Sequence, residues 1–433
     1  MTLRARWEEI RTGFAPPFWV ANGTELFERL AYYGLQAVLA IYLHERLRFS
    51  EEQTGLLQGV FGFVVWFLPI FGGALADRFG YRRILSLAYL VLSVGYFLFG
   101  SITAGWLAPV RAVIPLYWVV FVILMIPALG PGLVKPVVAG TTARASSEAM
   151  RSLGFSIYYT IVNIGGALGP LVGSGVRTTL GVESVCYMSA LFAFAMFLVT
   201  VFFFRELPVP ADHRVVTVGA AVRNMGKVLL NLRAVVFLLL FSGFYVVFWQ
   251  VYVALPLYVR GYVDAKSPID ALISIEGTGV ICFTVIVAWL TRRLHPVTTM
   301  ASGVLITSLS WLLLTVSGTT PFIAATLVGI AIGELTQAPR YYEYVSKLAP
   351  KGQEGTYLGF AFLPIAIGYL VGGPLGGWLV RHYGATARPA SMWYVVALIG
   401  VVTAALLWVY DRVVMPGRQD AEGGAQGSSQ TAS

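Results

Sequence analysis

The stretch GALADRFGYRR, Gly73–Arg83, places one aspartate and three arginines between two long apolar segments. Each flanking segment holds the roughly 20 apolar residues that a membrane-spanning helix needs, so we interpret the stretch as a loop at a membrane surface. Gly73 permits two helices to approach closely, and Gly80 permits a tight turn. We expect Asp77 to form an ionic latch with the basic residues of this loop. These basic residues are Arg78, Arg82 and Arg83.

The composition places the chain in a membrane. Of its 433 residues, 57% are hydrophobic and 12% are charged, and the mean hydropathy is +0.75. A soluble globular chain carries about 25% charged residues. The two cysteines, Cys186 and Cys282, lie far apart in apolar segments and lack the spacing of metal ligands. We expect no metal site and no cofactor.

Twelve apolar segments predict an all-α membrane protein of two six-helix bundles. The predicted spans are 18–43, 53–76, 84–104, 114–141, 153–177, 184–204, 234–260, 270–291, 297–317, 321–348, 355–380 and 389–411. The predicted parts are a cytoplasmic segment 1–17, an N-terminal bundle 18–204, a cytoplasmic linker 205–233, a C-terminal bundle 234–413 and a disordered tail 414–433. The tail is rich in Gly, Ser and Gln, which cannot build a packed core.

The basic residues predict the orientation of the spans. With both termini in the cytoplasm, the cytoplasmic segments hold 19 of the 30 lysines and arginines, against eight outside and three within spans. This bias is the one that the positive-inside rule describes. The net charge of +9 then follows from topology, so we expect no nucleic-acid partner. We place the protein as a monomer in the cytoplasmic (inner) membrane of a bacterium.

The first span contains ELFERLAYYG, Glu25–Gly34, which puts ionisable side chains inside an apolar helix. At 100° per residue, one helical face carries Glu25, Glu28, Arg29, Tyr32 and Gln36. An ionisable group at membrane depth costs roughly 2.5–3.5 kcal/mol on insertion scales, and such groups usually face a cavity and carry function. We interpret this face as the wall of a transport pathway.

Two bundles around a polar midline are typical of secondary transporters built from repeats. The stretch Gly73–Arg83 resembles the G-x-L-A-D-R-x-G-x-R-R loop of the major facilitator superfamily. The alternative is an ordinary basic loop, but a match over the whole stretch favours the superfamily. The resemblance implies transport by alternating access.

Four motifs resemble those of the proton-dependent oligopeptide transporters, the POT family. Glu25–Gly34 is similar to the first-helix motif E-x-x-E-R-F-x-Y-Y-G, with Leu30 in place of Phe. Gly130–Pro136 is similar to the fourth-helix motif G-x-G-x-x-K-P, and Gly154–Gly165 to the fifth-helix signature. Gly333–Pro350 contains the tenth-helix pattern. The motifs come in the same order as in the family and lie in both halves of the chain.

The resemblance implies a proton-sensitive network of Glu25, Glu28, Arg29 and Lys135. The membrane depths of these residues are consistent with such a network. At 1.5 Å per residue, Lys135 lies about 9 Å from the cytoplasmic end of its span, and the first-helix charges lie about 10–16 Å from the cytoplasmic end of theirs. Protonation of a glutamate would then release Arg29 or Lys135 for a substrate carboxylate. The alternative is a static buried ion cluster that only orients the helices.

The resemblance also implies substrate contacts. Glu334 matches an acid that contacts the amino terminus of a peptide, and Asn163 matches an amide of the same pocket. Glu276 stands where the family usually has asparagine, so a cationic substrate group would fit between Glu276 and Glu334. The alternative for Glu276 is a solvated acid at the outer mouth of the cavity. The other candidate contacts are Tyr32, Tyr33, Gln36 and Trp66, and packing is the alternative for each tyrosine.

Three positions depart from the family pattern. Gln36 replaces an arginine, Val253 replaces a seventh-helix glutamate, and Ala361 replaces an eleventh-helix tryptophan. These departures affect substrate recognition more than proton coupling. Arg340 and Glu343, near the cytoplasmic end of the tenth span, are a further candidate gate pair.

We expect a proton-coupled symporter of small zwitterionic solutes, with di- and tripeptides as the first candidates. The alternatives are a proton-driven exporter of another small organic solute and a non-transporting sensor of the same fold. We do not expect an enzyme, because His44-Glu45 is not followed by a second His at the zinc-protease spacing and no G-x-S-x-G motif occurs. The expected partners are a small-molecule substrate, protons and the lipid bilayer.

Overall fold

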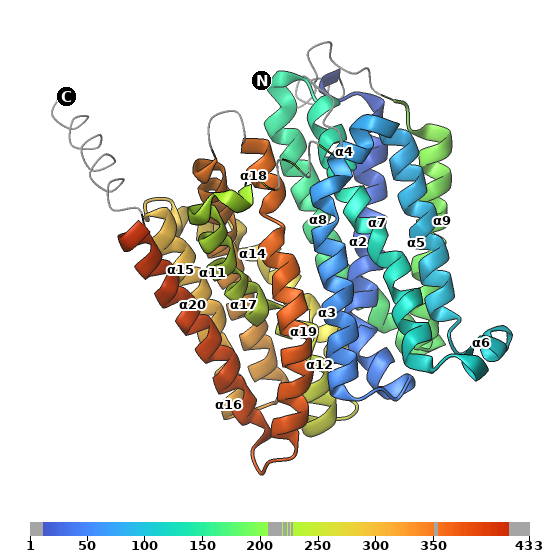
Figure 1. The fold of residues 1–433 in the computed structure, drawn as a ribbon, viewed down its shortest axis with the longest axis vertical. Coiled ribbons are helices and arrows are strands. Elements are labelled where there is room, and N and C mark those ends of the chain that lie inside the picture. The colour runs from blue at the N-terminus through green and yellow to red at the C-terminus, as the bar shows by residue number, and fades with distance from the viewer. Residues whose placement is uncertain are drawn as a thin grey trace.

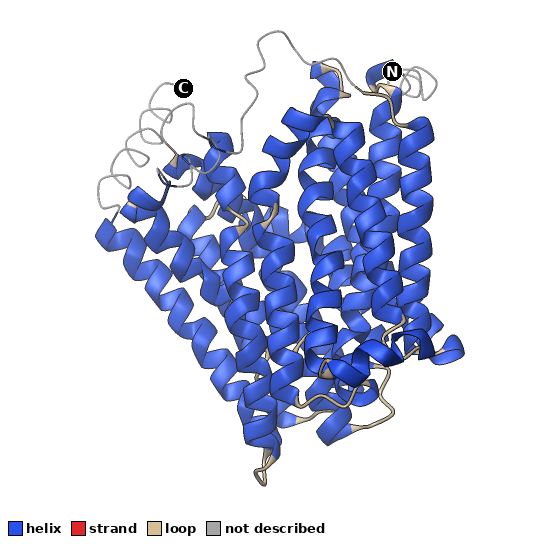
Figure 2. Cartoon of the chain, turned by 45° about the vertical axis from the view of Figure 1, so that its right-hand side comes forward, coloured by secondary structure: helices blue, strands red, loops and turns tan. Residues whose placement is uncertain are grey.

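The computed structural model describes residues 12–206, 228–349 and 354–414, together with Gly219, Arg223 and Gly226. In these residues every element longer than one isolated β-bridge is a helix (Figure 2). The predicted all-α class is therefore confirmed. The predictions for most of the linker 205–233 and for the tail 415–433 lie outside the described residues.

The helices form two groups that lie side by side in Figure 1. The first group, here called the N-half, contains α2 (Pro16–Ile41), η1 (Tyr42–Arg46), α3 (Glu51–Phe67), α4 (Pro69–Phe79), α5 (Tyr81–Gly100), η2 (Gly105–Leu107), α6 (Ala108–Val113), α7 (Leu116–Arg144), η3 (Glu148–Met150), α8 (Arg151–Leu180) and α9 (Val182–Phe203). The second group, the C-half, contains α11 (Leu232–Phe248), η4 (Trp249–Val251), α12 (Ala254–Tyr258), η5 (Val259–Val263), α13 (Ile269–Leu272), α14 (Ser274–Thr291), α15 (Pro296–Ser310), α16 (Leu313–Val316), α17 (Thr320–Leu348), α18 (Glu354–Phe360), α19 (Leu363–Gly384), η6 (Pro389–Ser391) and α20 (Met392–Val414).

The described helices are those of an integral membrane protein. Ten helical segments of the described chain are long and apolar enough to cross a membrane, and the bent pair α3–α4 would make an eleventh. α2 has 26 residues and is long enough to cross, but its apolar character is interrupted by Glu25, Glu28 and Arg29. The predicted boundaries of the first span, 18–43, differ from those of α2 by two residues at each end.

Prolines and breaks shape several spans. α3 and α4 meet at an angle of 44° because Pro69, the first residue of α4, has no N–H for the helical ladder. The seventh span, predicted as continuous, is interrupted where α11 ends at Phe248 and the 3₁₀ turn η4 follows. Pro339, by contrast, lies inside the continuous helix α17, so Arg340 and Glu343 keep their helical spacing.

The stretch Gly73–Arg83 forms the end of α4, a turn at Gly80 and the start of α5. Gly80 has a φ of +91°, which confirms the expected tight turn. The expected close approach occurs at Gly72 instead of Gly73. A Cβ on Gly72 would lie 2.8 Å from Cγ of Pro136 in α7, whereas the nearest atom to a Cβ on Gly73 is 4.0 Å away. The prediction for Gly73 was therefore wrong by one residue.

Two acids contact this turn. Tyr81 Oη donates to Asp77 Oδ1 at 3.3 Å, one helical turn away. Glu206, just after α9, accepts from the backbone N–H groups of Tyr81 and Arg82 at 2.8 and 2.9 Å. A carboxylate at a helix N-terminus is stabilised by the unpaired N–H groups and the helix dipole. The latch between Asp77 and the loop arginines stays a prediction, and Glu206 is a contact to which the sequence had assigned no role.

Glycines bring the two halves into close contact. In α3, a Cβ on Gly59 would lie 2.9 Å from Cδ of Pro374 in α19. In α14, a Cβ on Gly277 would lie 2.9 Å from the backbone nitrogen of Ala167 in α8. Small residues at such positions let helix backbones approach within a membrane. The pairs α3–α19 and α8–α14 therefore form two seams, and the cavity described below has walls from all four helices.

Candidate functional site

Glu25, Glu28 and Arg29 form a buried charge cluster in α2. Arg29 Nε lies 3.1 Å from Glu25 Oε1, and Arg29 also pairs with Glu28. All three side chains are at most 1% exposed. Arg29 stabilises both carboxylates, each of which would be strongly destabilising if it were buried without a partner. The structure thus brings the three predicted residues together, and their part in proton coupling stays a prediction.

Lys135 lies in α7 beside this cluster. Its Nζ is 3.4 Å from the centre of the Trp66 ring, which is a cation–π contact. Its charge also acts on Glu25 and Glu28. The sequence predicted one network of Lys135 with Arg29 and the two glutamates, and within it Arg29 makes the close ion pairs. An i, i+4 pair on one helix needs no movement of another helix to form.

A cavity of about 170 Å³ lies between the halves. Its wall includes eight aromatic side chains: Tyr33, Trp66, Tyr159, Tyr245, Phe248, Trp249, Tyr252 and Tyr342. The remaining polar side chains of the wall are Asn163, Glu276 and Glu334. No lysine or arginine lines this cavity within the described part of the chain. The wall is therefore aromatic and acidic.

Glu276 and Glu334 form a carboxyl pair in this wall, one from α14 and one from α17. Both carboxyl groups line the same cavity, so they approach one enclosed space from two helices. Glu276 is only 7% exposed, so the alternative of a solvated acid at the outer mouth is wrong. Its Oε1 has no hydrogen-bond partner among the described residues. Glu276 therefore offers a buried acceptor at the wall of the cavity.

The predicted substrate contacts divide into two groups. Those that line the cavity are Tyr33, Trp66, Asn163, Glu276 and Glu334. Tyr32 and Gln36 do not line it. Tyr32 is buried against Phe61, with ring centres 6.5 Å apart. Gln36 Nε2 donates at 2.8 Å to Oη of Tyr369 in α19. This hydrogen bond links α2 of the N-half to α19 of the C-half.

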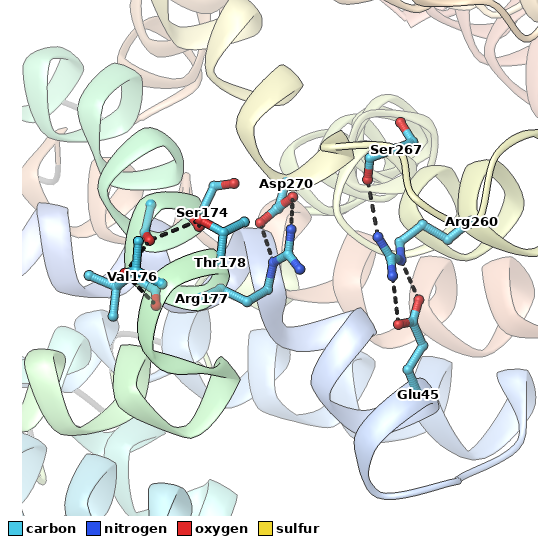
Figure 3. A network of polar contacts seen from close by, with 10 residues as sticks. Glu45, Ser174, Val176, Arg177, Thr178, Arg260, Ser267 and Asp270 are labelled. Atoms are coloured by element: carbon cyan, nitrogen blue, oxygen red, sulfur yellow. Dashed lines mark hydrogen bonds and ion pairs between the residues drawn. The ribbon is translucent and has the colours of Figure 1, made fainter.

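Ion pairs join the halves at the end of the molecule where α6 and α16 lie (Figure 1), which we call the α6 face. Arg177, in the last turn of α8, makes two contacts with Asp270 of α13, at 2.7 and 3.1 Å. Arg260 of η5 makes two contacts with Glu45 of η1, one of them at 2.8 Å, and donates to the carbonyl of Ser267 at 3.1 Å. Figure 3 shows both guanidinium groups facing their carboxylates across the boundary.

A third pair lies in the same region. Arg381 in the last turn of α19 lies 2.7 Å from Glu52 in the first turn of α3. The sequence had counted Arg177, Arg260 and Arg381 only among the eight basic residues on the outer side. Their partners are 93, 215 and 329 positions away, so no local pattern could have identified them.

Arg340 and Glu343 form the predicted pair, but inside the C-half. Arg340 Nη1 lies 2.8 Å from Glu343 Oε2, and Lys347 Nζ lies 2.7 Å from Oε1. Arg340 Nη2 also donates to the carbonyl of Arg292, just after α14, at 3.2 Å. A cation at a helix C-terminus satisfies unpaired carbonyls and the helix dipole. These contacts hold α14 to α17, and a part of this pair in gating stays a prediction.

The comparison with known families decides the assignment of this fold. Residues 24–363 and 265–431 match the model of the Major Facilitator Superfamily. The chain belongs to this superfamily. Its relatives are transporters, which agrees with the expectation that the protein is not an enzyme.

Curated relatives of this superfamily member are similar over nearly the whole chain. "Multidrug resistance protein MdtH" of Salmonella arizonae is 26% identical over 394 residues, which cover 89% of this chain and 92% of the relative. The protein of the same name from Salmonella newport is 26% identical over 396 residues, which cover 90% and 93%. The chain therefore has about the full length of these relatives.

Solved structures share the fold. An auto-inhibited POT family peptide transporter has a TM-score of 0.74 at 17% identity, with 92% of this chain and 97% of that chain covered. The nucleoside transporter NupG has a TM-score of 0.73 at 15% identity, with 91% and 99% covered. The POT resemblance in the sequence thus corresponds to a shared fold, and transporters with differently named substrates share it equally well.

Proposed function

We propose that this protein is a proton-coupled secondary transporter that moves a small organic solute through the cavity between its halves. The cavity with its buried acids carries the proposal. The wall has surfaces from both halves and contains Glu276 and Glu334, while Glu25 and Glu28 lie buried in α2, the helix that supplies Tyr33 to the same wall. Buried carboxyl groups beside a transport cavity are the usual proton carriers of such proteins.

We propose twelve spans, with α2 as the first and the bent pair α3–α4 as the second. A helix of 26 residues is about 39 Å long, enough to cross a bilayer. The charges of α2 are buried against other helices and not exposed to lipid. α2 then begins, and α20 ends, on the cytoplasmic side, as the distribution of basic residues predicts. The bacterial relatives fit a location in the inner membrane.

We propose that the three ion pairs close the α6 face in one state of the transport cycle. Each pair has one partner in the N-half and one in the C-half, so all three must separate when the halves part. The cavity would then be reached from the α6 face, while the opposite face closes. This is alternating access by movement of one bundle against the other.

The expectation of a peptide substrate has less support than proton coupling. A peptide carboxylate needs a cation, and the described wall has none. Lys135, the cation that the resemblance implies, contacts the ring of Trp66. The names of the relatives, for multidrug resistance, peptides and nucleosides, define the first solutes to test.

The test is a proton-flux assay in proteoliposomes that contain the pH dye pyranine. Dialanine, uridine and benzyltrimethylammonium are added outside, one at a time, and the change of internal pH is recorded. We expect at least one solute to drive proton movement, and we expect Glu28→Gln to reduce that movement at least tenfold while solute exchange continues. Glu343→Gln is the matched control, since Glu343 lies outside the cavity.

Two results would overturn the proposal. In the first, none of the three solutes, nor a wider set of amino acids and drugs, moves protons above the level of protein-free liposomes. In the second, Glu28→Gln couples solute to proton as well as the parent does, which would remove the α2 cluster from the mechanism. Size-exclusion chromatography of each variant confirms that it is folded before reconstitution.

A further inference from the structure

We propose that Trp66 is a positioning residue, through which the positive charge of Lys135 stabilises the closed α6 face. The ammonium group holds the indole ring against two aromatic rings of the C-half, those of Trp249 and Phe362. This inference rests on the proposed alternating access. It gives Trp66, which the sequence predicted as a substrate contact, a part in joining the halves.

One face of α3 carries three glycines followed by a tryptophan. These residues stand at i, i+4, i+7 and i+11, positions that share one helical face. They are Gly55, Gly59, Gly62 and Trp66. The glycines let α3 and α19 approach closely, and the Tyr369 ring of α19 occupies the space that a Cβ on Gly62 would fill. Trp66 ends this pattern with a large side chain, so at its level the halves touch through rings and not through backbones.

Trp66 lies at the inner end of the α3–α19 seam. The seam begins at the α6 face with the pair of Arg381 and Glu52, and Trp66 lies about 21 Å from Glu52 along α3, at 1.5 Å per residue. α3 ends at the next residue, Phe67, and α4 continues at an angle of 44°. Trp66 is therefore the last residue of the glycine face before the bend.

The Trp66 ring contacts aromatic rings of the C-half. Its centre lies 6.0 Å from that of Trp249 in η4 and 6.0 Å from that of Phe362, just before α19. Trp249 in turn stacks on Tyr369 of α19, with ring centres 4.0 Å apart. Trp66 is thus the contribution of the N-half to a cluster whose other rings belong to the C-half. These contacts must break when α3 and α19 part.

The Lys135 ammonium lies over the same indole ring. Its Nζ is 3.4 Å from the ring centre, and both residues belong to the N-half. Tryptophan attracts a cation more strongly than the other aromatic side chains do, most of all where water is excluded, and Trp66 is only 7% exposed. The close ion pairs of Glu25 and Glu28 are made with Arg29, so they do not draw Lys135 away from the ring. The ammonium therefore fixes the indole in the orientation that meets the C-half.

The test introduces fluorinated tryptophans at position 66, with one to four fluorines on the benzene ring of the indole. Each fluorine withdraws electron density from the ring face and weakens its attraction for a cation, while the shape of the side chain is nearly kept. Spin labels at Val113 and Val316, in different halves at the α6 face, report its opening by double electron–electron resonance. We expect the ratio of open to closed protein to rise stepwise with the number of fluorines, to about tenfold for four.

A double-mutant cycle assigns the effect to Lys135. Lys135→Met alone should raise the ratio of open to closed protein by about the same factor, and fluorination of Trp66 should then have no further effect. The control is fluorination of Trp118, which lies in α7 of the same half and is 55% exposed. The cation–π contacts of the described residues do not involve Trp118, so we expect the parent distribution.

Two results would overturn the inference. In the first, four fluorines on Trp66 leave the parent distribution unchanged. In the second, fluorination opens the α6 face equally with Lys135 and with Met at position 135, which would show that the ring joins the halves by packing alone. Both results concern a ring of nearly constant shape, and size-exclusion chromatography confirms that each protein is folded.

The outcome is separable from that of the proposed function. If fluorination of Trp66 does not open the α6 face but a solute drives proton flux in proteoliposomes, the part of Trp66 is wrong and proton-coupled transport stands. If fluorination opens the face but no solute drives flux, the contact between Lys135 and Trp66 stands as a device of the fold and the transport proposal fails.

Discussion

The substitution Asp270→Asn tests whether the Arg177–Asp270 pair holds the α6 face closed. The guanidinium makes two contacts with the carboxylate, at 2.7 and 3.1 Å, and the Asp270 side chain is fully buried. A hydrogen bond to a charged group contributes about 1.5–3 kcal/mol and a neutral one about 1 kcal/mol. Asparagine keeps one acceptor but removes the charge, so we expect the closed state to lose about 2 kcal/mol.

This loss has a measurable consequence for the populations. About 2 kcal/mol corresponds to a roughly 30-fold change in the equilibrium between the closed and open α6 face. If the open state makes up about 1% of the parent protein, it would make up roughly a quarter of the variant. A change of this size is visible in a distance distribution.

The measurement is double electron–electron resonance between spin labels at Val113 in α6 and Val316 in α16, both highly exposed and in different halves. The native Cys186 and Cys282 are first replaced by serine. The parent should give one distance population, and Asp270→Asn should add a second at longer distance.

The control is Glu183→Gln. Glu183 pairs with Arg46 at 2.5 Å inside the N-half, so its loss removes an ion pair without affecting the boundary between the halves. We expect the parent distribution for this control. If Asp270→Asn also gives the parent distribution, the ion pair does not stabilise the closed face and the gate must rest on other contacts.

Two further predictions follow from the packing. Gly59→Ala should produce the longer distance population in the same experiment, because the new Cβ would lie 2.9 Å from Cδ of Pro374. Gly175→Ala is the control and should not produce it, because no atom lies within 4 Å of the new Cβ. Equal effects of the two substitutions would contradict the role of the α3–α19 seam. Arg340→Ala should lower the free energy of unfolding by about 1 kcal/mol, through loss of its hydrogen bond to the carbonyl of Arg292. Thermal unfolding measures this change, and an unchanged midpoint would refute the capping role.

The sequence predicted the helices well because each span has to be apolar over its whole length. It placed the first span within two residues of α2 at each end. The break after Phe248 was missed, because the residues around it are as apolar as those of an unbroken span. Hydropathy indicates whether a segment lies in lipid or in water, but it does not indicate the geometry of the backbone.

The sequence predicted those parts of the site whose contacts lie within one helix. Helical periodicity grouped Glu25, Glu28 and Arg29 correctly, since their contacts lie within one helix. It could not show that α19 covers Gln36, because that contact joins residues 333 positions apart. Tyr33 lines the cavity although it lies off the predicted face. Which residues of a helix reach a cavity depends on its neighbours.

Whether a charged side chain already has an ion-pair partner determines which solutes it can attract. Arg29 is already engaged by two carboxylates, so a substrate carboxylate would have to displace one of them and leave it buried without a partner. Breaking a buried pair in this way costs about 3–5 kcal/mol. The Glu276–Glu334 pair has the opposite property, because its negative charge has no cation in the described wall. A positively charged group can therefore approach these two acids without displacing an ion-pair partner among the described residues.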